Sequence, residues 1–271
     1  MPLFAGMTDL QGATIWLIGG TQESGQVAAG LAEAQIPHLV TVVTAAAAGL
    51  YPDSPWRQVR VGAIAPKAMA AVLMAENIAA VIDASHPFAV EVSRSAISLC
   101  KSHHLPYLRL ERPAIGDSIP ASPWIQTVNA YDDLLNPAVL APQARSLLTV
   151  GAKNLHRFQP WHRRTTLFAR ILPRADSLQR AIAAGFTPDR IIAIRPPVSA
   201  DLERSLWQQW HITQVITKAS GAPGGEAIKR SLAQQLKVRL WILQRPPLAY
   251  PEQTETPAGA IAFCRRVLNK L

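Results

Sequence analysis

Short apolar runs alternate along the chain with stretches in which apolar residues recur every three or four positions. The runs predict strands over residues 13–18, 38–44, 58–62, 79–83, 106–110, 124–128, 146–151, 165–172, 190–194, 212–218 and 238–243. The periodic stretches predict helices over residues 22–34, 66–77, 86–103, 130–140, 177–185, 199–210, 225–236 and 256–271. This alternation is typical of an α/β fold, in which helical crossovers join parallel strands.

The alternation weakens over residues 113–146, where prolines are frequent, and then restarts. Domain boundaries commonly fall in such proline-rich segments. We therefore expect two α/β domains, residues 12–140 and 141–271, each with a mostly parallel sheet. No sequence repeat relates the two halves.

Composition and charge narrow the possible partners. The chain has 271 residues, 49% hydrophobic, with a net charge of +9, which is ample for a core and favours an anionic partner. The basic residues are scattered, whereas nucleic-acid binding needs them clustered, so an acidic small molecule fits better. A basic protein without a special partner remains an alternative.

Other features point to the cytoplasm. Cys100 and Cys264 lie in amphipathic stretches and are expected to be reduced core residues, and no cysteine or histidine spacing indicates a metal site. No apolar run is long enough to span a membrane, and the first ten residues lack the features of a signal peptide. We expect a cytoplasmic monomer or small homo-oligomer.

Ligands of parallel α/β sheets bind beyond the carboxyl ends of the strands, so the loops that follow the strands matter most. In the first, "GGTQESG", Gly19 and Gly20 allow positive φ and a close ligand approach, and Thr21 can cap the next helix. The N-terminus of that helix would attract a phosphate. The spacing does not match GxGxxG, so a plain strand–helix turn remains an alternative.

The loop after the second strand bears on the choice of cofactor. A NAD-binding fold usually carries an acidic residue here, but this chain has Thr44 and a run of alanines. The absence of a carboxylate favours NADP over NAD. Arg57 and Arg60 are the candidate partners of its 2′-phosphate.

Four further loops carry candidate chemistry. In "DASHPFA", Ser85 can cap a helix with Pro87 in its first turn, and His86 should project from the end of a strand. "LRLERP" places arginines at the next strand end, where they suit carboxylates or surface salt bridges equally well. "TVGAKNLHRF" and "ITKASGAPGGEAIKR" end strands of the second half, and the second of these resembles an anion cradle but not a Walker A loop.

Taken together, these motifs resemble a known family. "GGTQE", "DASHPFA", "LRLERP", "LLTVGAKNL", "ARILPR", "VITKASGAPGG" and "ILQRP" occur in this order and at similar spacing in the precorrin-6A reductases of cobalamin biosynthesis, over residues 14–246. The chain departs from the family pattern at residues 195–199, at Ala219, and in the alanine-rich loop after the second strand.

The resemblance implies two Rossmann-like domains with a cleft between them, and NADPH as hydride donor to one double bond of precorrin-6A or its cobalt form. The substrate is an acidic tetrapyrrole, which suits a basic protein. Expected cofactor contacts are Gly19, Gly20, Thr21, Glu23, Thr44, Lys218, Ser220 and Gly221. Expected substrate contacts are Ser85, His86, Phe88, Arg109, Arg112, Lys153, Gly224 and Gly225. His86 is the candidate proton donor, because imidazole titrates near neutral pH.

Two other classes remain open. A non-catalytic nucleotide- or tetrapyrrole-binding protein on the same scaffold would bind these ligands without oxidising NADPH. A nucleotide-sugar epimerase or reductase would normally carry a Tyr-x-x-x-Lys pair on a helix, and no tyrosine of this chain has a lysine four residues on.

Overall fold

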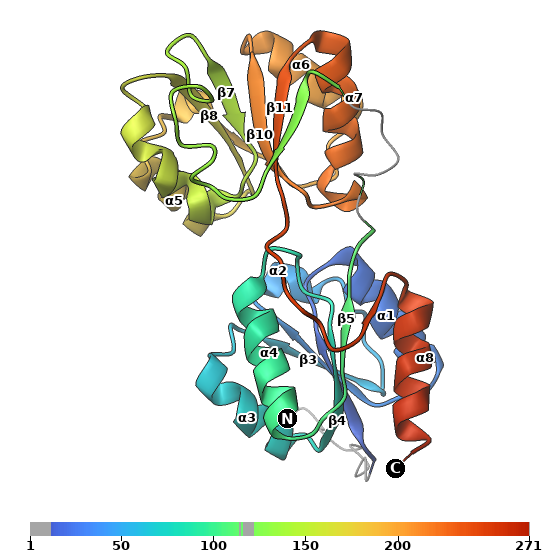
Figure 1. The fold of residues 1–271 in the computed structure, drawn as a ribbon. Coiled ribbons are helices and arrows are strands. Elements are labelled where there is room, and N and C mark those ends of the chain that lie inside the picture. Colours follow the sequence, from blue (N-terminus) through green and yellow to red (C-terminus); the bar gives the residue numbers. More distant parts are fainter. Residues whose placement is uncertain (1–11, 114, 116–121, 271) are drawn as a thin grey trace. The chain divides into compact units, whose positions relative to one another are not determined.

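The computed structural model describes residues 12–113, 115 and 122–270, and these form two compact units. Unit 1 runs to Arg112 and resumes at Pro247, whereas unit 2 is Pro113–Pro246. Each unit has one six-stranded sheet, and every strand pair in both sheets is parallel (Figure 1). The expected α/β class with two parallel sheets is confirmed.

The sheet of unit 1 has the strand order β12-β5-β4-β1-β2-β3. Its strands are β1 (Thr14–Ile18), β2 (His38–Val42), β3 (Arg57–Val61), β4 (Ile78–Asp83), β5 (Tyr107–Leu110) and β12 (Gln253–Thr254). Its helices are α1 (Gln22–Glu33), α2 (Ala45–Ala48), α3 (Pro66–Ala75), α4 (Val90–Ser102) and α8 (Pro257–Leu268).

Strand β1 is apolar throughout because both faces of the sheet are covered. Ile15 and Leu17 pack into the core that includes α1 and α8. Trp16 and Ile18 pack into the core on the other face, with α3 and α4. A continuous apolar run is what a parallel strand buried on both sides requires.

The sheet of unit 2 has the order β6-β11-β10-β7-β8-β9. Its strands are β6 (Ile125–Val128), β7 (Arg145–Leu148), β8 (Thr166–Ile171), β9 (Ile191–Ala193), β10 (Gln214–Lys218) and β11 (Arg239–Leu243). Its helices are η1 (Ala152–Trp161), α5 (Ala175–Ala183), η2 (Pro188–Arg190), α6 (Ala200–Gln209), η3 (Ala222–Gly224) and α7 (Glu226–Leu236).

The two sheets share one topology. In each unit the first five strands along the main α/β run are ordered 3-2-1-4-5, as in the Rossmann fold. Only the sixth strand differs in origin, because β12 follows unit 2 in the chain whereas β6 precedes the other strands of its own sheet. Each unit therefore has its own topological switch point, at β1/β4 and at β7/β10. We call the carboxyl ends of the strands around these two points the β1/β4 edge and the β7/β10 edge.

The unit boundaries differ from the expected domains of residues 12–140 and 141–271. The chain crosses to unit 2 near residue 113 and returns near residue 247. Strand β6 pairs with β11, and α8 buries Phe263 and Cys264 in the core of unit 1. Pairing partners more than a hundred residues apart decide this division, so the local pattern did not indicate it.

Two expected helices also differ. No helix forms over 130–140: the Asp133 carboxylate accepts from the N–H groups of Asn129 and Ala130, and the side-chain oxygen of Asn136 accepts from Ala138 and Val139. Such side-chain to main-chain bonds compete with helix formation. The helix expected from residue 86 begins at Val90, so residues 86–89 form a turn.

Candidate functional site

The β1–α1 loop is built around a buried tyrosine hydroxyl. A Cβ on Gly19 would lie 2.3 Å from Tyr51 Oη, so only glycine fits there. The main-chain N–H of Gly19 donates to Thr41 O at 2.9 Å, and that of Gly20 donates to Tyr51 Oη at 2.7 Å. Both N–H groups are therefore already bonded within the protein, whereas Gly19 and Gly20 were expected to contact the cofactor.

Gly20 nevertheless leaves room for a ligand. It has a φ of 101° and no atom within 4 Å of the position that a Cβ would occupy. Thr21 caps α1, as expected, with its Oγ1 accepting from Ser24 N at 3.2 Å. The next two main-chain N–H groups, of Gln22 and Glu23, have no intrahelical acceptor. A ligand phosphate would therefore be held by the first turn of α1, beside the open face of Gly20.

An ion pair joins this turn to the end of β5. Arg112 Nε lies 2.7 Å from Glu23 Oε1, and Arg112 Nη2 lies 2.9 Å from Glu23 Oε2. The expected cofactor contact Glu23 and the expected substrate contact Arg112 are thus partners of each other. The arginine compensates the carboxylate charge, which would otherwise repel a phosphate at this helix end.

Asp83 organises the loop after β4. Its buried carboxylate accepts from Ser85 N at 2.9 Å, Ser93 Oγ at 2.5 Å and Tyr107 Oη at 2.8 Å, and pairs with Arg109 Nη1 at 3.0 Å. Burial, and secondarily the Asp83 charge, raise the pKa of Tyr107, so this hydroxyl stays a donor. The carboxylate fixes the Ser85 loop.

Arg109 does not occupy the position that was expected of it. Its side chain is 1% exposed, and it donates to Asp83, to Ser85 Oγ at 3.2 Å and to Glu111 at 2.8 Å. These bonds hold the guanidinium inside unit 1. A direct bond to a substrate carboxylate does not fit this burial. Arg109 instead stabilises the loop that contains Ser85.

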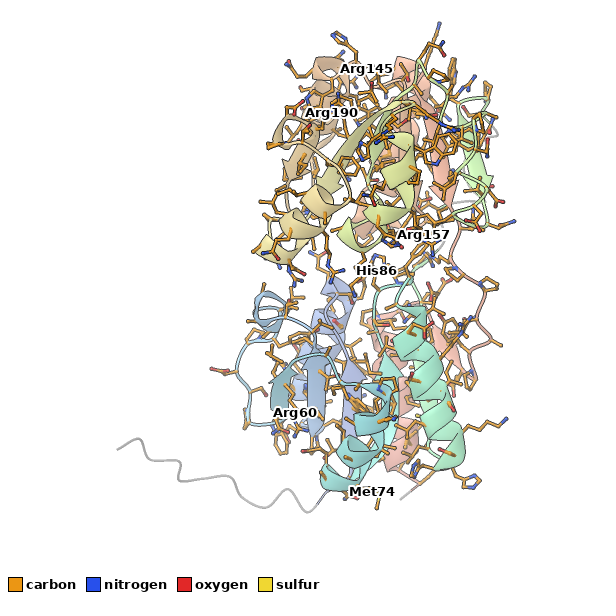
Figure 2. The ribbon with its side chains drawn as sticks, turned by 90° about the vertical axis from the view of Figure 1, so that its left-hand side faces the viewer. Arg60, Met74, His86, Arg145, Arg157 and Arg190 are labelled. Atoms are coloured by element: carbon orange, nitrogen blue, oxygen red, sulfur yellow. The ribbon has the colours of Figure 1, made fainter. Side chains whose placement is uncertain are left out.

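His86 is exposed beyond the carboxyl end of β4, and Figure 2 shows it at that end of the unit 1 sheet. Its Nδ1 accepts from the main-chain N–H of Phe88 at 3.2 Å, and the two rings lie 6.0 Å apart. Since a main-chain N–H can only donate, Nδ1 is unprotonated and the proton of the neutral ring is on Nε2.

The β7/β10 edge of unit 2, at the carboxyl ends of its strands, carries cationic side chains. Lys153 follows β7, Lys218 ends β10, and Arg245 follows β11, where its Nε donates to Ala219 O at 2.8 Å. Burial lowers the pKa of Lys218 to about 8, and the nearby charge of Lys153 contributes to the shift. This edge is therefore electropositive, as an anion site requires.

The glycine-rich loop of unit 2 uses its amides internally. Gly221 N donates to Glu226 Oε2 at 3.1 Å, and Glu226 Oε1 in turn accepts from Arg230 Nε at 3.0 Å. A buried carboxylate thus occupies the N-terminus of α7, where an anion cradle was expected. The groups that this loop region could offer to an anion are therefore side chains such as Lys153 and Lys218, and not the Gly221 amide.

Comparisons with known proteins agree with this architecture. The family model for "Precorrin-6x reductase CbiJ/CobK" matches residues 14–265. The chain belongs to the precorrin-6x reductase family.

Its similarity to two cobalt-precorrin-6A reductases and to one solved structure extends over nearly their whole length. It is 44% identical over 260 residues to the cobalt-precorrin-6A reductase of Synechocystis sp., covering 94% of this chain and 97% of that one. It is 32% identical over 250 residues to the cobalt-precorrin-6A reductase of Salmonella typhimurium, covering 92% and 94%. The solved structure of "CobK precorrin-6A reductase" shares the fold, with a TM-score of 0.75 at 21% identity, covering 96% of this chain and all of that one.

In this precorrin-6x reductase the expected residues fall into two groups, one in each unit. Gly19, Gly20, Thr21, Glu23, Ser85 and His86 lie at the β1/β4 edge, and Lys153, Lys218, Ser220 and Gly221 lie at the β7/β10 edge. Tyr51 and Glu226 were not among the expected residues, although they determine which amides are available. In the sequence, the signal that could have indicated Tyr51 is its position directly after the alanine-rich loop.

The expected 2′-phosphate partners are engaged elsewhere. Arg57 begins β3, at its amino end, and donates to His38 Nε2 at 3.1 Å and to Ala28 O at 2.8 Å. Burial lowers the pKa of His38 to about 4, so its ring stays neutral and accepts this bond. Arg60 pairs with Glu76, and Thr44 caps α2. Neither arginine supports the choice of NADP that the sequence suggested.

Two kinds of feature are absent from the described residues. Within residues 12–113, 115 and 122–270, no helix is both long enough and apolar enough to cross a membrane. The same part of the chain contains no group of three or more potential metal ligands.

Proposed function

We propose that this chain reduces one macrocycle double bond of precorrin-6A or cobalt-precorrin-6A, with NADPH as hydride donor, to give the 6B form in cobalamin biosynthesis. The observation that carries the proposal is the 44% identity, over 94% of the chain, to a protein named cobalt-precorrin-6A reductase. Family membership and the paired Rossmann-like units support it.

The β1/β4 edge of unit 1 suits the nucleotide. Gly20 has open space at its α-carbon, and the first turn of α1 offers two amides to a pyrophosphate. Thr21, and Thr44 beyond β2, would lie along the nucleotide. When bound, NADPH supplies the hydride.

We assign the β7/β10 edge of unit 2 to the substrate, although Lys218, Ser220 and Gly221 were expected to contact the cofactor. Lys153, Lys218 and Arg245 offer positive charge to the acetate and propionate groups of the macrocycle. Burial, and secondarily the charge of Lys153, lower the pKa of Lys218 to about 8, and a bound carboxylate would offset the repulsion between the two lysines. The net charge of +9 favours the same acidic ligand.

The protein contributes mainly orientation and the exclusion of water. Holding the two reactants in line can supply roughly 7–11 kcal/mol of barrier reduction. His86 is the proposed source of the proton: its imidazolium gives up the Nδ1 proton, and the resulting neutral ring, with its remaining proton on Nε2, is the one that accepts the Phe88 N–H at Nδ1. The observed bond therefore stabilises the ring after transfer. We further propose that the protein catalyses this reaction in the cytoplasm.

The test is to incubate the purified protein with precorrin-6A and with its cobalt form, adding NADPH or NADH. We expect loss of nicotinamide absorbance together with a shifted macrocycle spectrum, and faster reaction with NADPH. A non-catalytic binding protein would instead bind the macrocycle while the nicotinamide absorbance stays constant. That outcome would refute the proposal.

A further inference from the structure

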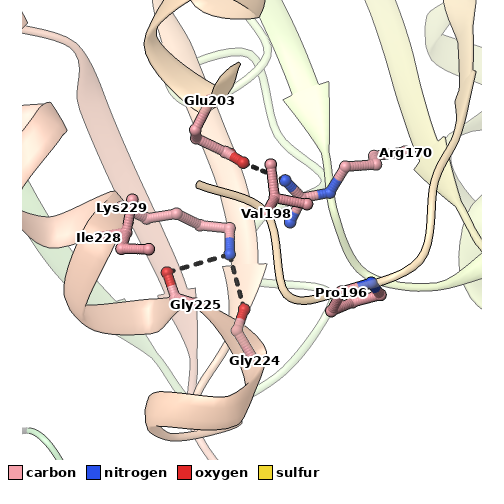
Figure 3. A pocket seen from close by; sticks show the side chains of 8 residues that line it. All are labelled: Arg170, Pro196, Val198, Glu203, Gly224, Gly225, Ile228 and Lys229. Carbon is pink, nitrogen blue, oxygen red and sulfur yellow. Dashed lines mark hydrogen bonds and ion pairs between the residues drawn. The ribbon is translucent and has the colours of Figure 1, made fainter. Parts of the chain in front are cut away.

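Lys229 is a buried lysine that makes no ion pair within the described part of the chain. It lies on α7 with 1% of its surface exposed. Its Nζ donates to Gly224 O at 2.8 Å and to Gly225 O at 3.3 Å (Figure 3). Burying a charged group without a counter-ion is costly, so its presence calls for a physical reason.

The acids nearest to Lys229 are bonded to other groups. Glu203 on α6 pairs with Arg170 on β8 and accepts from Trp207 Nε1 at 3.1 Å. Glu226 pairs with Arg230, at 2.9 Å between Oε1 and Nη2. Burial, and secondarily the charge of Arg170, lower the pKa of Lys229 to about 8, against the opposing effect of the two acids.

The space beside Lys229 is too small for a ligand. The cavity lined by Arg170, Pro196, Val198, Glu203, Ile228 and the loop glycines measures about 10 Å³. A volume of this size holds at most one water molecule. Any role of the ammonium group must therefore act through the two carbonyl groups that it binds.

Those carbonyl groups belong to a loop whose shape is closely specified. Gly225 has a φ of 69°, and a Cβ there would lie 3.3 Å from Lys229 Nζ. A Cβ on Gly224 would lie 1.8 Å from Ser220 Oγ, so the loop packs directly on Ser220. Ser220 is two residues from Lys218 at the cationic edge of unit 2. The contacts thus lead from the ammonium group to the proposed substrate site.

We propose that Lys229 is a positioning residue that holds the Gly221–Gly225 loop against Ser220, so that Lys218 and Ser220 face the carboxylates of the substrate. This inference rests on the proposed function of the β7/β10 edge. It explains why a charge is retained where an apolar side chain of the same length would be cheaper to bury.

The decisive variant is Lys229→Met, which keeps the length of the side chain and removes its charge and its donors. We expect the KM for precorrin-6A to rise about tenfold while kcat and the KM for NADPH change less than twofold. The melting temperature should be unchanged or higher, because an uncompensated buried charge is lost. Lys237→Met, which removes the same charge from the exposed far end of α7, is the matched control and should behave as wild type.

A purely structural role predicts a different result. A lower melting temperature with a matching loss of kcat in Lys229→Met would overturn the inference, and so would an unchanged KM for precorrin-6A. A rise in the KM for NADPH alone would also overturn it. The wild-type enzyme in the same assay tests the proposed function separately, because failure of wild type to oxidise NADPH would refute that function whatever the variant does.

Discussion

Tyr51 Oη lies 2.7 Å from the main-chain nitrogen of Gly20 and 2.6 Å from Ser24 Oγ. The Ser24 hydroxyl gives its proton to Thr21 O at 2.6 Å, so Tyr51 must be the donor to Ser24. A directed chain of hydrogen bonds therefore runs from Gly20 through Tyr51 and Ser24 to Thr21. It sets the shape of the loop that we assign to the nucleotide.

Tyr51→Phe tests this chain. The ring still packs on Gly19, but Gly20 loses its acceptor, so we expect the free energy of unfolding to fall by about 1 kcal/mol. The KM for NADPH should rise several-fold with kcat little changed, as measured by steady-state kinetics and chemical denaturation. Tyr131→Phe is the control, because that buried hydroxyl has no hydrogen-bond partner among the described residues and its loss should cost nothing. An unchanged KM for NADPH in Tyr51→Phe would show that the loop does not depend on the hydroxyl.

Asp83→Asn should be strongly destabilising. It puts a neutral amide in place of one of the two carboxylates, of Asp83 and Glu111, that pair with the buried Arg109, and the loss of one partner of a buried ion pair typically costs about 3–5 kcal/mol. Chemical denaturation measures the loss. Glu252→Gln breaks the exposed pair with Arg266 and should cost no more than about 1 kcal/mol. Similar losses in the two variants would mean that the Asp83 network does not stabilise unit 1.

His86→Asn separates proton delivery from ligand binding. If His86 supplies the proton, kcat should fall on the order of a hundredfold while the KM for NADPH stays the same. His103→Asn, an exposed histidine after α4, is the control. Unchanged single-turnover hydride transfer together with unchanged substrate affinity would remove His86 from both proposed roles.

The affinity for substrate should depend on pH through Lys218. Its pKa is lowered from 10.5 to about 8, so the ammonium form that binds an anion is present below pH 8 and is lost above it. The KM for precorrin-6A should therefore rise above pH 8. Lys153→Met removes a repelling charge, so the rise should begin at higher pH.

The lowered pKa of Lys218 affects folding stability and substrate affinity in opposite directions as the pH rises. Between pH 8 and 10.5 the unfolded chain binds more protons at Lys218 than the folded one, so this residue's contribution to the free energy of unfolding rises with pH. Binding and stability should therefore change in opposite directions over this range. A KM that stays flat across pH 8 would count against Lys218 as a contact of the substrate.

The sequence alone determined the α/β class and the order of the strands and of most helices, and it named the strand-end loops that we propose as the site. Thr21 caps its helix as expected, and Cys100 and Cys264 are buried free thiols. These features follow from apolar periodicity and from hydrogen bonds between residues three apart, both of which are local.

Tertiary structure alone decided which strands share a sheet and which polar groups are already satisfied. The placement of α8 in unit 1, the burial of Arg109 against Asp83, and the bonds of Tyr51 to Gly20 and of Glu226 to Gly221 were not expected. Most of these contacts join residues that are far apart in the sequence and are brought together by the strand order. In each of them, burial determines that the groups bond to each other. Local sequence names the donors and acceptors, but folding decides which of them remain available to a ligand.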